Sequence, residues 1–153
     1  MVSLPFEVGV ISDTHRLLRP EAVLALEGCQ AIFHAGDIGS PSIISELESI
    51  APCYAVSGNC DDNLDFPLVV CREIQGLRIL MYHGHHPILE SDYCPNLVIT
   101  GHTHIPEIIQ EREVLRLNPG SAGPRRFRQP VTLARLKIIE RRVEAQIIHL
   151  PVG

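Results

Sequence analysis

The first third of the chain alternates short apolar segments with segments of helical spacing, and this alternation limits the possible folds more than any other feature. The segments "RPEAVLALEG" and "SPSIISELESI" carry apolar residues at helical spacing, each with a proline suited to the first helical turn. Ser40 is placed to cap the second helix. The strand-like segments around them are "FEVGVIS", "AIFHAG" and "PCYAVSG". Strands that alternate with helices form right-handed βαβ units, so we expect a mainly parallel sheet.

From Phe66 onward the pattern changes to hairpins. The segment "FPLVVCREIQGLRILMYHG" predicts two strands joined at Gln75-Gly76, and "NLVITG" predicts another strand. Further hairpins are expected in "EIIQEREVLRLNPG" and "VTLARLKIIERRVEAQIIHL". A parallel half followed by a hairpin-rich half predicts an α/β fold of two sheets packed face to face, with helices outside. A chain of 153 residues suits one domain, which we place at residues 1–153.

Composition excludes several classes of function. The net charge of −5, from 13 basic and 18 acidic residues, offers no general attraction to nucleic acid or to an anionic membrane. No apolar run reaches the roughly 20 residues of a membrane span, and the N-terminal segment lacks the basic region of a signal peptide. The five cysteines are an odd number without a CxxC pair, which argues against a disulfide framework. We therefore expect a cytoplasmic protein that binds neither nucleic acid nor membrane.

Polar residues follow the predicted strands at the point where each strand ends. One such residue alone is usually a turn residue, a helix cap or a half-buried histidine. Together they favour a shared polar site, because ligands bind at the carboxyl edge of open α/β sheets. The five strand ends carry Asp13-Thr14-His15, Gly36-Asp37, Gly58-Asn59-Cys60-Asp61, His83-Gly84-His85 and Gly101-His102-Thr103-His104.

These side chains form a ligand set for divalent transition metals. Clustered carboxylates without a cation would repel one another, whereas carboxylates and neutral imidazoles together bind Mn, Fe, Ni or Zn in preference to Ca. Two Asp, one Asn and four His exceed the four ligands of a tetrahedral zinc ion and suit two ions that share one carboxylate. Such a pair activates water and neutralises a substrate oxyanion, which is the chemistry of phosphoester hydrolysis.

The ordered motifs DxH, GD, GNxD, HG and GHTH resemble the calcineurin-like metallophosphoesterase family. The small size, the "GNCD" segment and the "NPGS" after "GHTH" are similar to its compact prokaryotic branch, the YfcE-type phosphodiesterases. The resemblance implies a four-layer α/β/β/α sandwich of two packed mixed sheets with outer helices. It also implies two divalent ions, with Mn expected and Ni, Fe or Zn as alternatives. The first ion would be held by Asp13, His15, Asp37 and His104, and the second by Asp37, Asn59, His83 and His102.

Two departures from the family pattern bear on mechanism. Many larger members carry a histidine at the position of Cys60, where it helps to protonate the leaving group; a thiol cannot copy a cationic imidazole. Cys60 is therefore open to a catalytic role or to the role of a small, partly buried thiol. The segment between His85 and Asn96 is too short, and too rich in proline, for the helix that the family has there. One wall of the site is then open or supplied by another subunit, which is the reason to consider a homo-oligomer.

Residues near the motifs have weaker assignments. His34, His85 and Asp61 could orient metal ligands or be polar residues of a wet loop. Arg125 and Arg126 could meet substrate phosphate, although the interpretation as solvated loop residues is favoured. Turn chemistry is a sufficient explanation for the "NPGS" segment.

The leading hypothesis is a phosphodiesterase in which hydroxide bound to a dinuclear metal centre attacks a small phosphodiester substrate. Asp37, Asn59 and His83 would act in catalysis through the metals and the bound hydroxide. One alternative is a phosphomonoesterase or nucleotidase. Another is a non-catalytic scaffold that resembles the retromer subunit of the same fold and binds partner proteins. The complete set of seven ligands, Asp13, His15, Asp37, Asn59, His83, His102 and His104, favours an enzyme.

Overall fold

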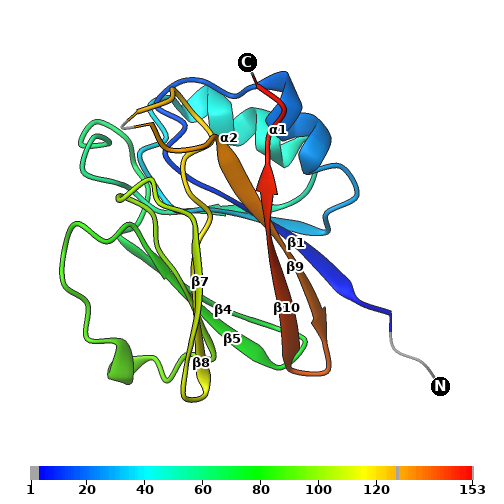
Figure 1. Cartoon of the computed structure of the whole chain (residues 1–153). Helices are drawn as coiled ribbons and strands as arrows, with labels where there is room; N and C mark the ends of the chain where they lie inside the picture. Colours follow the sequence, from blue (N-terminus) through cyan, green and yellow to red (C-terminus); the bar gives the residue numbers. More distant parts are fainter. Residues whose placement is uncertain (1–3, 127, 153) are drawn as a thin grey trace.

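Two five-stranded sheets pack face to face in the computed structural model, which describes residues 4–126 and 128–152 (Figure 1). The first sheet has the order β10-β9-β1-β2-β3 and the second the order β4-β5-β6-β8-β7. The strands of the first sheet are β1 (Phe6–Ile11), β2 (Ala31–His34), β3 (Cys53–Ala55), β9 (Thr132–Ile139) and β10 (Arg142–His149). Those of the second are β4 (Val69–Ile74), β5 (Leu77–Tyr82), β6 (Leu97–Ile99), β7 (Glu107–Glu111) and β8 (Val114–Asn118).

The first sheet combines a parallel part with a C-terminal hairpin. β1 runs parallel to β2, and β2 runs parallel to β3, so the carboxyl ends of all three strands reach the same edge. β9 pairs antiparallel with both β1 and β10. The βαβ units predicted from the alternating pattern are confirmed.

The second sheet is also mixed. β4 and β5 form the expected hairpin, and Gln75 and Gly76 at its turn both have positive φ angles, as a tight two-residue turn requires. β5, β6 and β8 are parallel, and β7 is antiparallel to β8. The carboxyl ends of β5 and β6 therefore lie at one edge as well.

Two short helices cover the outer face of the first sheet. α1 (Pro20–Ala25) and α2 (Pro41–Glu48) each begin at a proline, and the Ser40 hydroxyl accepts a hydrogen bond from the backbone N–H of Ser42 at the start of α2. Leu26 beside α1 and Leu47 of α2 are buried in one cluster with outward-facing strand residues such as Ile32. Neither helix is long and apolar enough to cross a membrane, and the described residues contain no other helix that is.

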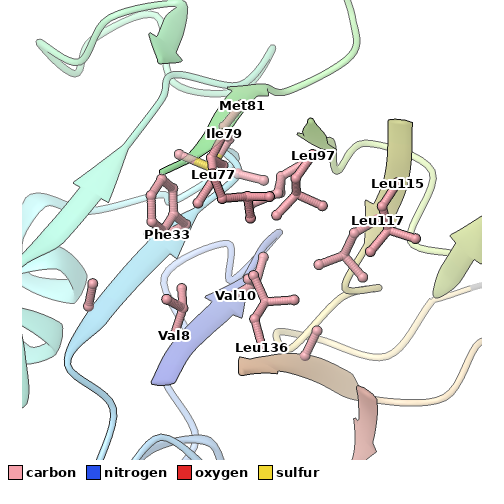
Figure 2. Close-up of a cluster of buried hydrophobic side chains, with 14 of the residues drawn as sticks. Val8, Val10, Phe33, Leu77, Ile79, Met81, Leu97, Leu115, Leu117 and Leu136 are labelled. Carbon is pink, nitrogen blue, oxygen red and sulfur yellow. The ribbon is translucent and has the colours of Figure 1, made fainter. Parts of the chain in front are cut away.

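The main hydrophobic core lies between the two sheets. Val8 and Val10 of β1 alternate with outward-facing residues, so both face the second sheet. Figure 2 shows them close to Phe33 of β2 and opposite Ile79 and Met81 of β5, and all five side chains are fully buried. The two sheets are thereby fixed against each other directly behind the edge where their parallel strands end.

The outer face of the second sheet is covered differently from that of the first. Between β5 and β6 the chain forms only one 3-10 turn, η1 (Glu90–Asp92), and the described part of this segment contains no α-helix. The Glu90 carboxylate accepts hydrogen bonds from Tyr82 of β5 and Arg116 of β8, which holds the turn against the sheet. The predicted sandwich of two packed mixed sheets with outer helices is confirmed, and its fourth layer is reduced to this segment.

Candidate metal centre

Loops from both sheets bring the predicted polar residues to one edge of the sandwich. Asp13 follows β1, Asp37 follows β2 and Asn59 follows β3, all in the first sheet. His83 follows β5 of the second sheet directly, and the loop after β6 carries His102 and His104. The first sheet thus supplies two carboxylates, an amide and, through His15, one imidazole, and the second supplies three imidazoles.

The backbone is strained at most of these positions. A positive φ is rare for residues other than glycine and costs about 1–3 kcal/mol for each residue that adopts it. Such angles occur at Asp13 (56°), His15 (46°), Asp37 (54°), His102 (72°) and His104 (65°). Glycine would remove the strain together with the side chain, so the strained backbone marks positions where a side chain is needed.

Glycines in the same loops allow the close approach of the strand ends. A Cβ atom at Gly58 would overlap the carboxylate and the backbone nitrogen of Asp37. One at Gly101 would overlap the Ser12 hydroxyl and crowd the Asp13 carboxylate. The glycines that precede Asn59 and His102 are therefore required for the packing of the site.

Asp13, His15 and His104 form a first group of donors. Oδ1 of Asp13 is 3.3 Å from Nε2 of His104 and 3.9 Å from Nε2 of His15. One donor atom from each of the three residues lies within 4.8 Å of the others. These distances suit a single ion held between the three side chains.

Asp37 and His83 form a second group, which Asn59 and His102 complete. Oδ2 of Asp37 is 3.3 Å from Nε2 of His83, and Oδ1 of Asn59 is 3.0 Å from the same nitrogen. Oδ1 of Asn59 is also 3.1 Å from Nδ1 of His102. His102 and His104 are two residues apart in the sequence and lie in different groups.

Burial and the neighbouring polar groups shift the pKa values of Asp37 and His83 in opposite directions. Burial raises the pKa of Asp37, but hydrogen bonds from His83 and from the backbone N–H of Cys60 outweigh it and hold the pKa below its usual value. Burial lowers the pKa of His83, but the hydrogen bond to Asp37 and the charge of Asp13 outweigh it and raise the pKa. The Asp37 carboxylate and the His83 ring therefore each favour the charged form of the other.

The arrangement fits divalent cations. Oδ1 of Asp13 and Nε2 of His15 are buried and have no hydrogen-bond partner in the described part of the chain. Nδ1 of His83 lies 2.7 Å from the Ala35 carbonyl, to which it must donate, so Nε2 is the ring atom that faces the cluster. Around this nitrogen are oxygens of Asp13, Asp37 and Asn59, all of which are acceptors. A cation can take the place of the proton that His83 needs there.

Asp61 holds the two loops of the first sheet together. Its carboxylate is 1% exposed and accepts hydrogen bonds from the backbone N–H groups of Ile38, Gly39 and Gly58. One of the two roles considered for Asp61, orienting the ligands beside it, is thus supported by its contacts.

His34 has a similar structural role. It is completely buried, and its Nδ1 accepts a hydrogen bond from the backbone N–H of Gly36. Its Nε2 therefore carries the proton and donates to the Thr14 hydroxyl, which donates to the Ile38 carbonyl. Burial lowers the pKa of His34 to about 4, so the ring is neutral and this set of hydrogen bonds is fixed.

The "NPGS" segment does more than form a turn, in contrast to the turn-only interpretation of the sequence. The Asn118 side chain donates hydrogen bonds to the Gly101 carbonyl and the Thr103 hydroxyl, within the loop that carries His102 and His104. The Ser121 hydroxyl donates to the Asp13 carbonyl. The only sequence signal for these contacts is the position of "NPGS" in the ordered motifs, because the partners are far apart in the chain.

The donors lie beside an open pocket. Its volume is about 580 Å³, and its lining includes His85, His102 and Arg116. Arg126 is close enough to His15 for its charge to contribute to the lowered pKa of that histidine, whose main cause is burial. A substrate at the candidate metal centre can therefore extend into this pocket.

Comparison with known proteins assigns the family. Residues 6–141 match the calcineurin-like phosphoesterase superfamily domain. The chain belongs to this superfamily. A probable metallophosphoesterase of Methanothermobacter thermautotrophicus is 36% identical over 93% of this chain and 91% of that protein. The phosphodiesterase YfcE of Escherichia coli K12 is 29% identical over 75% of this chain and 74% of that protein.

The structural comparison agrees with the sequence. The crystal structure of Chaetomium thermophilum Vps29 matches 95% of this chain and 100% of that chain, with a TM-score of 0.78 and 18% identity, which supports the fold alone. Together with the family match, these relatives identify the chain as a metal-dependent phosphoesterase. The predicted family and enzyme class are confirmed, whereas the roles of the seven ligands stay predictions.

Proposed function

We propose that this calcineurin-like phosphoesterase is a phosphodiesterase with two divalent ions, most simply Mn, at the candidate metal centre. Asp13, His15, Asp37 and His104 would hold the first ion, and Asp37, Asn59, His83 and His102 the second. The observation that carries the proposal is the position of Asp37. Its Oδ2 lies 3.7 Å from Nε2 of His15 and 3.3 Å from Nε2 of His83, between the two groups. Oδ1 of Asp13 is 3.9 Å from each of these nitrogens, so Asp37 is the better placed bridge.

Bound ions would supply an activated water and neutralise charge on the phosphate oxygens. The protein contributes orientation. The hydrogen bond to Ala35 fixes the His83 ring with Nε2 toward the cluster, and Asp61 fixes the loops that carry Asp37 and Asn59. The pocket lined by His85 and Arg116 offers space for the group on the far side of the scissile bond.

The preference for a diester follows from the charges around the site. A diester carries one negative charge, which the metal ions can neutralise, whereas a monoester dianion needs further cations. No arginine of the described residues donates a hydrogen bond to any of the seven ligands, and Arg116 is paired with Glu90 and Glu111. A small phosphodiester is therefore the substrate class that the site favours.

A phosphomonoesterase is the second candidate, and one observation favours it. Arg126 is close enough to help lower the pKa of His15, so its guanidinium could meet an additional phosphate charge. A scaffold like Vps29 receives support only from the fold, while the seven predicted ligands, four of which are buried, have no evident use in a scaffold. The free state of all five cysteines fits a reducing, cytoplasmic location, which is part of the proposal.

The test compares two substrates on one preparation. Protein stripped of metal by a chelator and reloaded with Mn is expected to hydrolyse bis(p-nitrophenyl) phosphate with a higher kcat/KM than p-nitrophenyl phosphate. The chelated protein should hydrolyse neither. The reverse order of the two substrates would favour the phosphomonoesterase, and Arg126→Gln should then reduce monoester hydrolysis specifically.

A further inference from the structure

The thiol of Cys60 lies beside donor atoms of both groups. Its Sγ and one donor atom each of His15 and Asp37 all lie within 4.8 Å of one another. The backbone N–H of Cys60 donates a 2.9 Å hydrogen bond to Oδ1 of Asp37, which fixes the residue over that carboxylate. The Asn59 amide donates to Sγ at 3.6 Å. The thiol is thus held at the solvent side of the cluster by two independent contacts.

A second observation points to a cation at the same place. The Asp13 side chain is completely buried, and its Oδ1 has no hydrogen-bond partner among the described residues. This oxygen lies 3.9 Å from Nε2 of His15, and a donor atom of His15 also lies within 4.8 Å of Cys60 Sγ. A carboxylate oxygen that gave up water without gaining a hydrogen bond is stabilised by a nearby cation.

We propose that Cys60 is an additional ligand for thiophilic divalent ions, such as Zn, Co or Cd, at the first metal position beside His15 and Asp37. This inference rests on the proposed function, because it assumes that an ion binds there. It makes Cys60 a residue that sets metal selectivity, in addition to the seven ligands.

The geometry and the chemistry of the thiol agree with this role. A nitrogen and a sulfur on one tetrahedral zinc ion are about 3.6 Å apart, given bond lengths near 2.1 and 2.3 Å. Sγ of Cys60 and the donor atoms of His15 and Asp37 lie within 4.8 Å of one another without an ion, and the Cys60 side chain is exposed. On binding, a sulfur–metal bond forms, the S–H bond breaks, and the proton leaves to the solvent.

The softness of the sulfur donor determines which ions bind more tightly when Cys60 is a ligand. Thiolates favour Zn and similar ions, whereas carboxylates and water suit Mn. The Cys60 thiol therefore strengthens binding of Zn, Co or Cd and leaves binding of Mn nearly unchanged. Serine has almost the same size without the soft donor, so Cys60→Ser isolates this property.

Cobalt gives a direct readout that does not depend on activity. Metal-free native protein titrated with Co²⁺ is expected to show d–d bands in the visible region and a sulfur-to-cobalt charge-transfer band in the near ultraviolet. Cys60→Ser should keep the d–d bands and lose the charge-transfer band. Cys71→Ser is the matched control, because Cys71 is exposed on β4 and belongs to none of the candidate donor groups of the described residues.

Competition measurements give the second readout. Cys60→Ser should weaken Zn binding by about tenfold or more, while Mn binding changes little. Removal of a group that only orients a metal ligand already weakens metal binding by about tenfold, so the loss of a ligand should cost at least as much. Cobalt bound with equal near-ultraviolet absorption in native protein and Cys60→Ser would overturn the inference and leave the two-metal proposal intact. Failure of native protein to bind any cobalt would overturn both.

Discussion

At the scale of single residues, Asp37 is the most demanding position in the site. Its carboxylate is 3% exposed, its backbone has a positive φ, and its two oxygens have different partners. Oδ1 accepts the Cys60 N–H, while Oδ2 faces the imidazoles of His15 and His83. No other residue type offers two acceptor oxygens on so short a side chain.

Replacement of Asp37 by alanine is expected to cost more activity than loss of any other ligand, because a bridging carboxylate serves both ions. We expect a decrease in kcat/KM on bis(p-nitrophenyl) phosphate of at least about 100-fold. Loss of a group that only orients a metal ligand costs up to about 100-fold, and loss of a ligand shared by two ions should cost more. Elemental analysis should show that less Mn is bound. Asp62→Ala, at an exposed residue nearby, is the control. Unchanged activity in Asp37→Ala would contradict the two-metal centre.

At the scale of elements, the loops after β2 and β3 act as one unit through Asp61. Three backbone N–H groups, from Ile38, Gly39 and Gly58, converge on its carboxylate. Hydrogen bonds to a charged group contribute about 1.5–3 kcal/mol each, and a buried donor left unpaired costs a similar amount. The precision of the metal centre therefore depends on a residue that need not touch a metal.

Asp61→Ala should lower the free energy of unfolding by about 3 kcal/mol or more, because it leaves the three backbone donors without an acceptor. It should also weaken Mn binding by roughly 10–100-fold, as the loops that carry Asp37 and Asn59 lose their common anchor. Denaturant unfolding and metal titration measure the two effects. If Asp61→Ala bound Mn as tightly as native protein did, the loops would be positioned by other contacts.

The 3-10 turn η1 is tied to the second sheet by an ion pair. The hydrogen bonds from Arg116 lower the pKa of Glu90 against the opposing effect of burial. A carboxyl whose pKa is lowered by folding stabilises the protein above its unfolded pKa, and this contribution is lost as the pH falls through its folded pKa. The hydrogen bond to Glu90 and burial together raise the pKa of Tyr82 to about 12, so Tyr82 stays protonated as a donor at neutral pH.

Glu90→Gln is expected to reduce the free energy of unfolding at pH 7 by about 1 kcal/mol, the upper range for a partly exposed ion pair. The difference from native protein should disappear as the pH is lowered below the usual carboxyl range, where native Glu90 is protonated too. Denaturant unfolding across this range measures it. An effect of Glu90→Gln that is independent of pH would mean that the contact is one of packing alone.

At the scale of the whole molecule, the residues of the candidate metal centre come from both sheets. Asp13, His15, Asp37 and Asn59 come from the first sheet, and His83, His102 and His104 from the second. Ions held by both sets would join the sheets at the edge where the main core ends. Binding of metal and packing of the sheets are then coupled, because separation of the sheets would break the coordination of both ions.

Removal of metal should lower the thermal stability of the whole chain. An ion present at 100 times its dissociation constant adds about 2.7 kcal/mol, which for a protein of this size corresponds to roughly 5–10 °C in Tm. Thermal unfolding with Mn and with chelator measures the shift. Asp37→Ala should show a much smaller difference between the two conditions. An equal Tm with and without bound Mn would show that the ions do not connect the sheets.

The sequence was sufficient to predict both the strands and the edge at which they deliver polar residues. Each motif follows a short apolar segment, so the positions of Asp13, Asp37 and His83 could be derived from local pattern alone. The contacts that hold them could not. Ser121 reaches Asp13 across 108 positions, and Asn118 reaches the loop of His102 from a neighbouring strand. Such contacts depend on how the strands are ordered in the sheets, which apolar periodicity does not specify.

The place of β9 in the first sheet has a consequence for synthesis of the protein. β1, which leads into Asp13 and His15, pairs on one side with β9, and β9 is made only from residues 132–139. A nascent chain that already contains all seven ligands still has an unpaired β1 edge and lacks the Ser121 contact to Asp13 until later residues leave the ribosome. We therefore expect hydrolytic activity to arise only after residues 132–139 have left the ribosome and paired with β1.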